Sequence, residues 1–236
     1  GGHDAAHKLQ ILASIAYNTF IDLPQVPVEG IAGIEPADIR YARELGYVVK
    51  LLAIAKHTDG ELEVRVAPTL VLQDHLLASV RGVYNGVYLV GDAAGPQMFY
   101  GRGAGEMPTA SAVVSDIVEI AANILAKRAS RPAILPRPGT RSALALKPLE
   151  QIRTRYYLRV MVADKPGVLS KVSGVLGKHN VSIASVIQKA RHEQEAVPIV
   201  MMTHEAREGD MRAALAGIDC LDVVSAKTIC LRVEEP

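Results

Sequence analysis

A proline-rich stretch over residues 129–155 constrains how this chain folds more than any other feature. The stretch also carries six basic residues against one acidic residue. Proline has no backbone N–H and breaks both helices and central strands, so this density of prolines favours an extended linker. We therefore predict two domains, 1–128 and 156–236, joined by a linker over 129–155. The prolines are Pro132, Pro136, Pro138 and Pro148.

The composition is that of a globular protein without strong charge. Of the 236 residues, 49% are hydrophobic and 22% charged, and the formal net charge is +1, which argues against binding to nucleic acid or to an anionic membrane. No apolar run approaches the roughly 18 residues of a membrane span, and the start has no signal-peptide pattern. Two cysteines, Cys220 and Cys230, make no disulfide framework, so we expect both to be small core residues and the protein to be cytoplasmic.

Hydrophobic periodicity predicts an α+β domain over the first half of the chain. Residues 4–18 have apolar residues at helical spacing and read as a mostly buried helix. The sequence from Thr58 to Glu61 favours a hairpin turn, and the alternation of Leu62, Val64 and Val66 with charged residues predicts a strand with one wet face. We expect a mixed sheet with helices on one face. The predicted helices are 4–18, 36–45 and 108–127, and the predicted strands are 47–56, 61–72, 83–91 and 97–100.

The second half predicts a βαββαβ order, which is that of a ferredoxin-like unit. Its first strand alternates, a turn containing Asp164 and Gly167 follows, and the next helix is amphipathic. Such a unit has exposed strand edges that invite pairing with a second copy. The predicted strands are 156–163, 181–190, 196–203 and 222–233, and the predicted helices are 168–179 and 207–216.

A glycine cluster runs directly into the helix predicted to begin at Pro108. Gly101, Gly103 and Gly105 remove side chains just before a helix N-terminus, which can face a flat or anionic ligand. A tight structural turn is the alternative explanation. The cluster does not complete the dinucleotide fingerprint G-x-G-x-x-G, because Glu106 occupies its last position.

Asp4 and Lys8 are four residues apart and so share one face of the first predicted helix. An acid and an amine placed there are able to hold an amino-acid substrate and to transfer a proton, provided that burial lowers the pKa of the lysine toward the working pH. An exposed ion pair without function is the alternative. His3 and His7 flank Asp4 at the same spacing, but no third and fourth ligand are evident, so we predict no metal site.

Three blocks of the first half resemble homoserine dehydrogenases. The segment GRGAGEMPTASAVVSDI is similar to the part of these enzymes that closes over the nicotinamide, and DAAHKLQILA is similar to their catalytic helix. The block from Glu29-Gly-Ile to GYVVKLLAIA agrees with both. The resemblance implies NADP- or NAD-dependent interconversion of L-homoserine and L-aspartate 4-semialdehyde, with Lys8 as the catalytic proton donor and Asp4 as the substrate-binding residue. It also implies that Gly103, Ala104 and Gly105 contact the cofactor.

The same resemblance implies that the nucleotide-binding half lies upstream of this sequence. We expect that half to hold most of the cofactor and to carry the residue that selects NAD or NADP. The 236 residues alone are then expected to be inactive, because no domain is present to hold the hydride donor.

The second half resembles an ACT domain. The resemblance rests on Asp164-x-x-Gly167 between the first strand and helix and on Asn180-Val-Ser-Ile183 at the second strand. It implies an amino-acid effector, with threonine expected, bound by Asp164, Gly167, Asn180 and Gln188 in a homodimer or homotetramer. Asp164 has a structural alternative as a helix cap. For the whole chain the alternative is a non-catalytic, amino-acid-binding ACT-type dimerisation module.

Overall fold

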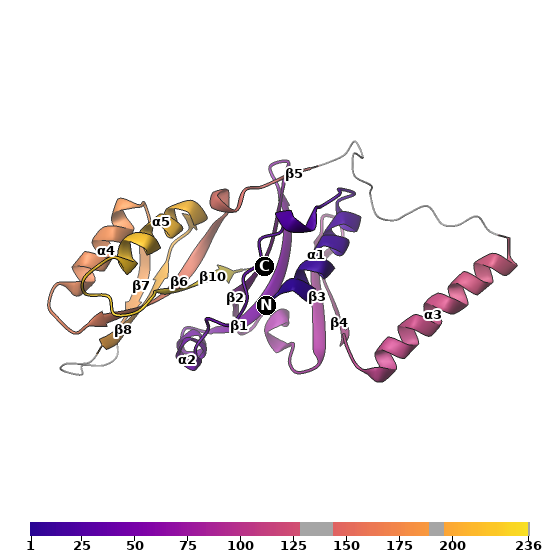
Figure 1. Cartoon of the computed structure of the whole chain (residues 1–236), viewed down its shortest axis with the longest axis horizontal. Coiled ribbons are helices and arrows are strands. Elements are labelled where there is room, and N and C mark those ends of the chain that lie inside the picture. The colour runs from indigo at the N-terminus through magenta and orange to yellow at the C-terminus, as the bar shows by residue number, and fades with distance from the viewer. Residues whose placement is uncertain (128–143, 189–195, 236) are drawn as a thin grey trace. The chain divides into compact units, whose positions relative to one another are not determined.

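The computed structural model describes residues 1–127, 144–188 and 196–235. The chain divides into two compact units, one formed by residues 1–72 and 135–236 and the other by residues 73–134. The first unit contains both the start of the chain and the whole βαββαβ region (Figure 1).

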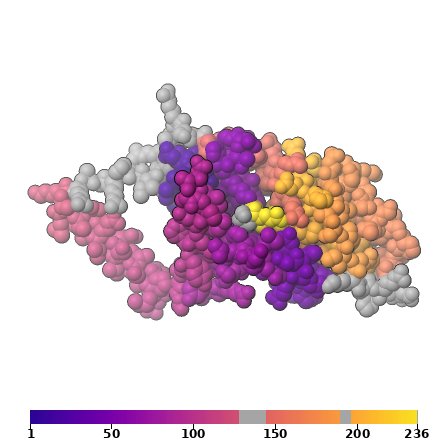
Figure 2. Space-filling view, turned by 180° about the vertical axis from the view of Figure 1, so that it is seen from behind, coloured from indigo at the N-terminus to yellow at the C-terminus, as the bar shows by residue number. Residues whose placement is uncertain are grey.

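One mixed sheet organises the first unit. Its strands follow the order β1-β2-β10-β6-β8-β7, while β5 pairs with β2 and β9 with β6. The last strand, β10, therefore lies between the β1–β2 hairpin and the rest of the βαββαβ region, as Figure 2 shows for the yellow end of the chain. The strands are β1 (Tyr47–Thr58), β2 (Glu61–Leu72), β5 (Ala145–Leu146), β6 (Arg153–Ala163), β7 (Ile183–Ile187), β8 (Ala196–Thr203), β9 (Ala206–Arg207) and β10 (Ile229–Glu234).

The first helix, α1 (His3–Ala16), packs against β1 and β2 with a narrow face. Ala6, Leu9 and Ala13 are buried at helical spacing, as an amphipathic helix requires. The prediction of a mostly buried helix was wrong, because Leu12 is 51% exposed and Ala16 is also exposed. The sheet covers one side of α1 only, so residues a quarter turn away remain in solvent.

The β1–β2 hairpin closes as the sequence predicts. Asp59 and Gly60 both have positive φ, 54° and 80°, which a two-residue hairpin turn requires. The prediction that one face of β2 is exposed to solvent was wrong, because the Arg65 side chain on that face is only 2% exposed. β10 and the segment 27–29 both bond to the edge of β2, and Arg65 Nη2 donates a hydrogen bond to Glu234 on β10 at 2.9 Å.

The helix α2 (Pro36–Glu44) begins where the sequence predicts. Pro36 occupies the first turn, and the backbone N–H of Glu35 donates to Asp38 Oδ2 at 3.0 Å in a reciprocal capping box.

The βαββαβ order of the second half is confirmed. The helices α4 (Val168–Lys178) and α5 (Glu208–Asp219) contact each other and bury Val172, Leu176 and Met211 against the sheet (Figure 1). The last strand begins at Ile229 and not at residue 222. The intervening residues make only an isolated bridge to β6, between Val224 and Val162, and the N–H of Thr228 donates to Asp219 Oδ1 at 2.9 Å just before the strand begins. Residues 189 and 190 of the predicted second strand lie outside the described residues.

The predicted linker is only partly described. Residues 145–155 contain β5, a 3-10 turn (Leu149–Gln151) and the start of β6, so this part of the segment is structured. Residues 129–143 lie outside the described part of the chain, and the domain boundaries stay predictions.

The second unit consists of a hairpin followed by a long helix. β3 (Tyr84–Gly91) pairs with β4 (Gly95–Arg102), and the rings of Tyr84 and Tyr100 stack 4.8 Å apart. α3 (Glu106–Leu125) starts two residues before the predicted Pro108. By length and composition, α3 is long and apolar enough to cross a membrane. This corrects the expectation that the sequence contains no such run. One helix of this kind is weak evidence of a membrane span.

The two cysteines differ in burial. Cys230 packs against the core of the βαββαβ region, and burial raises the pKa of its thiol. Cys220 is exposed, so its predicted place in the core is wrong. It follows the last turn of α5 and lies where that helix meets solvent.

Candidate functional site

Asp4 and Lys8 lie together on the exposed face of α1. Lys8 Nζ donates a hydrogen bond to Asp4 Oδ2 at 2.7 Å, as the spacing of four residues predicts. The side chain of Lys8 is 59% exposed and that of Asp4 is 83% exposed. The burial that we expected around a proton-donating lysine is thus not supplied by the residues that the structure describes. The catalytic and substrate-binding roles of the pair stay predictions.

The start of α1 is fixed by a close backbone contact. Gly2 precedes the helix with φ 89°, and a Cβ there would lie 2.9 Å from Val28 Cγ1 and 3.3 Å from Val66 Cγ1. Only glycine combines this left-handed conformation with so little space. The first turn, which carries Asp4, is therefore positioned by β2 and by the segment beside it.

The glycine loop lies in the second unit, between β4 and α3. Gly105 has φ 131° and ψ 159°, a conformation essentially restricted to glycine, and no side chain caps the helix that follows. A Cβ on Gly103 would overlap the side chain of Asn85 on β3. Ala104 and both glycines are exposed, so the loop presents backbone to solvent. The cofactor-binding role of Gly103, Ala104 and Gly105 stays a prediction.

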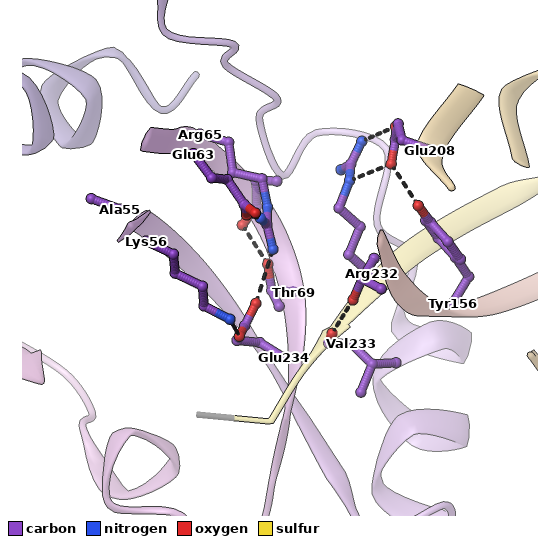
Figure 3. Close-up of polar contacts among 12 residues, drawn as sticks. Ala55, Lys56, Glu63, Arg65, Thr69, Tyr156, Glu208, Arg232, Val233 and Glu234 are labelled. Atoms are coloured by element: carbon purple, nitrogen blue, oxygen red, sulfur yellow. Dashed lines mark hydrogen bonds and ion pairs between the residues drawn. The ribbon is translucent and has the colours of Figure 1, made fainter. Parts of the chain in front are cut away.

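A buried polar network joins the start of the chain to β10, and sequence reasoning missed it (Figure 3). Arg232 donates to Glu208 through Nε at 2.9 Å and through Nη2 at 2.5 Å, and Tyr156 Oη donates to Glu208 at 2.9 Å. Beside it, Glu234 accepts from Arg65 at 2.9 Å and from Lys56. Charged residues inside apolar, β-prone runs were the available signal.

Hydrogen bonds decide the ionisation of this network. Burial opposes the charge on Glu208, but bonds from Arg232 and Tyr156 outweigh it and hold the pKa of that carboxyl below its usual value. Burial lowers the pKa of Arg65, and the positive charge of Arg232 lowers it further, although Glu234 partly compensates. The network is thus made of charged groups that are stable only while their partners stay in place.

A second buried pair connects α2 to β6. Asp38 is fully buried and accepts from Arg159 through Nε at 2.7 Å and Nη2 at 3.1 Å. Tyr157 Oη also donates to Asp38, at 3.0 Å. A single carboxylate thus serves as helix cap and as the anchor of two side chains from the βαββαβ region.

The predicted effector residues lie in the turns of the βαββαβ region. Asp164 and Gly167 lie between β6 and α4, Asn180 follows α4 and Gln188 follows β7. Gly167 and Asn180 have positive φ, 86° and 58°. The N-cap residue of α4 is Gly167, which has no side chain, and the effector role of these four residues stays a prediction. Over the described ranges, no group of three or more His, Cys, Asp or Glu is arranged to hold a metal.

Comparison with known proteins identifies the family. The family model for homoserine dehydrogenase matches residues 1–118, and the ACT domain model matches residues 156–216. A homoserine dehydrogenase from Neisseria gonorrhoeae is 40% identical over 234 residues, which are 99% of this chain and 54% of that protein. The chain belongs to the homoserine dehydrogenase family.

Other members of the homoserine dehydrogenase family agree in sequence and in fold. The homoserine dehydrogenase of Synechocystis sp. is 44% identical over 98% of this chain and 54% of its own length. The crystal structure of the enzyme from Thiobacillus denitrificans superposes with a TM-score of 0.88 at 40% identity, covering 99% of this chain and 53% of that one. The chain spans about half the length of the curated relatives that it matches. The α+β fold with a C-terminal ACT domain is confirmed.

Proposed function

We propose that the gene product carrying this chain is an NAD(P)-dependent homoserine dehydrogenase, which interconverts L-homoserine and L-aspartate 4-semialdehyde in threonine and methionine biosynthesis. The observation that supports this best is the Asp4–Lys8 pair on α1, in a chain of which the homoserine dehydrogenase model matches residues 1–118. A hydrogen-bonded acid and amine at the solvent-facing start of a helix suit an amino-acid substrate.

In the direction of reduction, Lys8 donates a proton to the carbonyl oxygen of the semialdehyde while the carbonyl carbon gains a hydride. The product is the primary alcohol of homoserine, and the oxidation direction returns the proton to Lys8. Asp4 orients the substrate and holds Lys8 Nζ through the 2.7 Å hydrogen bond. A positioned proton donor typically contributes a factor of about 10² to 10⁴ to the rate.

The glycine loop fits the cofactor because its exposed backbone leaves room for a planar ring. Gly103, Ala104 and Gly105 would cover the nicotinamide, which supplies or accepts the hydride when bound. The conformation of Gly105 excludes any larger residue from this turn. The choice between NAD and NADP depends on residues that contact the ribose.

We propose that the ACT domain is the regulatory domain of this enzyme. We propose that threonine binds through Asp164, Gly167, Asn180 and Gln188, and that the protein is a cytoplasmic homodimer or homotetramer. One edge of the ACT sheet, β10, is already paired with β2, so edge-to-edge pairing with a second copy has β7 available as the other terminal strand.

The decisive test is homoserine-dependent NAD(P)H formation by the complete gene product and by its Lys8→Ala variant. We expect turnover to fall by a factor of about 10² or more, while circular dichroism stays unchanged because Lys8 is exposed. Lys178→Ala, at the last turn of α4, is the matched control and should keep full activity.

Two outcomes would contradict the proposal. A folded, cofactor-competent wild type without turnover would favour the alternative, a non-catalytic ACT-type binding module. Full activity of Lys8→Ala would leave the dehydrogenase function but remove Lys8 from the chemistry.

A further inference from the structure

A short segment at Glu29 connects the last strand of the ACT domain to the first turn of the catalytic helix. Glu29 Oε2 accepts a hydrogen bond from Arg232 Nη1 at 2.7 Å. Arg232 lies on β10 and Glu29 lies before α2, so the bond spans 203 residues of sequence. The Glu29 side chain is 49% exposed whereas that of Arg232 is 9% exposed. The pair is thus formed by a fixed cation and a more accessible carboxylate.

Arg232 is fixed because Glu208 holds the other side of its guanidinium. Nε and Nη2 both bond to Glu208, and Nη1 alone is directed to Glu29. A planar guanidinium held at two of its nitrogens has little freedom to turn. Its third nitrogen, Nη1, therefore lies at a fixed position, and the hydrogen bond from Nη1 restricts where the Glu29 carboxylate can lie.

The backbone around Glu29 is in turn bound to β2 and touches the start of the chain. The N–H of Glu29 donates to Val66 O at 2.8 Å, and the N–H of Val66 donates to Pro27 O at 2.9 Å. A Cβ on Gly30 would lie 3.2 Å from the Gly1 backbone, and one on Gly2 would lie 2.9 Å from Val28 Cγ1. Residues 28–30 thus form the surface against which α1 begins.

We propose that Glu29 is a positioning residue for the dehydrogenase reaction, and that its ion pair with Arg232 lets the ACT domain hold the first turn of α1 in place. The inference rests on the proposed function for its kinetic consequence only. Asp4 is in the first turn of α1 and Lys8 in the second. Loosening the segment 28–30 therefore displaces the substrate-orienting Asp4 more than the proton donor.

Hydrogen exchange tests the positioning directly, without any need for activity. In the complete gene product, Glu29→Gln removes the charge and keeps the shape, and we expect the hydrogen-bonded amides of residues 6–8 to exchange roughly three- to tenfold faster. Glu235→Gln is the matched control, because Glu235 pairs with Arg155 near the same end of β10 and does not contact residues 28–30. Gly2→Ala is the positive control, because it disturbs the same turn sterically.

Kinetics separate positioning from a general loss of stability. Glu29→Gln is expected to raise the KM for homoserine about three- to tenfold, with a smaller change in kcat. Glu29→Asp keeps the carboxylate and should recover part of the loss. A merely structural effect would lower the active fraction, and therefore kcat, and would leave KM as in the wild type.

The proposal is overturned if Glu29→Gln leaves exchange at residues 6–8 unchanged while Gly2→Ala accelerates it. It is also overturned if kcat falls without a rise in KM, or if Glu235→Gln has the same effect. If the wild type has no dehydrogenase activity, the proposed function fails, and the exchange comparison still decides whether Glu29 and Arg232 hold α1.

Discussion

Replacing Asp38 by asparagine tests whether a buried ion pair secures the ACT domain to the first part of the chain. The carboxylate of Asp38 is fully buried and is shared by Arg159, Tyr157 and the N-terminus of α2. Hydrogen bonding to Asp38 is the main reason that the pKa of Arg159 is raised. Asparagine keeps the size and one acceptor oxygen, so the substitution removes charge and leaves little empty space.

The magnitude follows from what remains around Arg159. Removing one partner of a buried ion pair costs about 3–5 kcal/mol, because the other charge is left without compensation. Glu35 still lies 2.9 Å from Arg159 Nη2, but its side chain is 59% exposed and compensates only in part. We therefore expect Asp38→Asn to lower the free energy of unfolding by about 3 kcal/mol, the lower end of that range.

Urea unfolding followed by circular dichroism measures this change. With a slope of about 3 kcal/mol/M, the midpoint should fall by about 1 M. The double variant Asp38→Asn/Arg159→Met should recover much of the loss, since it removes the stranded charge. Asp222→Asn, which breaks the exposed pair with Lys171, serves as the control with an unchanged midpoint. An unchanged midpoint for Asp38→Asn, or no recovery in the double variant, would refute the reasoning.

Two further predictions concern backbone strain and alkaline pH. Gly105→Ala should lower the local opening free energy after β4 by about 1–3 kcal/mol, because φ is 131° there. Gly101→Ala, with open space and no positive φ, should change it by less than about 0.5 kcal/mol; equal exchange in both would contradict the strain argument. Burial raises the pKa of Tyr156 and of Tyr157 above the usual value of about 10. Their contribution to stability is therefore complete below about pH 10 and is lost as the pH rises further, so the tyrosinate absorbance of these two side chains should appear together with unfolding. Ionisation of all eight tyrosines without loss of circular dichroism would contradict this.

Local rules predicted most of the secondary structure, whereas the roles of the site residues come from the family resemblance and stay predictions. The hairpin at Asp59-Gly60, the start of α2 at Pro36 and the βαββαβ order all depend on near neighbours in sequence. The Asp4–Lys8 hydrogen bond follows from helical spacing alone. These features were predictable because each is decided within a few residues.

Burial was predicted less well, because it depends on which distant segments cover a strand. Arg65 follows the alternation of a wet face, yet it is buried. Nothing in the alternation of β2 indicates that β10 will pair with it, 163 residues later. The same reason explains why Leu12 was expected in the core and is exposed.

The sequence by itself therefore determined the family and the order of helices and strands, and it supplied Asp4 and Lys8 as candidates for the chemistry. Only the tertiary structure decided that β10 continues the sheet into the first part of the chain, and that Arg232 reaches Glu29 beside the start of α1. The physical reason is the separation along the sequence of the residues that interact. Turn chemistry and helical spacing act between neighbours, whereas a buried charge is stable only where the completed fold brings its partner within hydrogen-bonding distance.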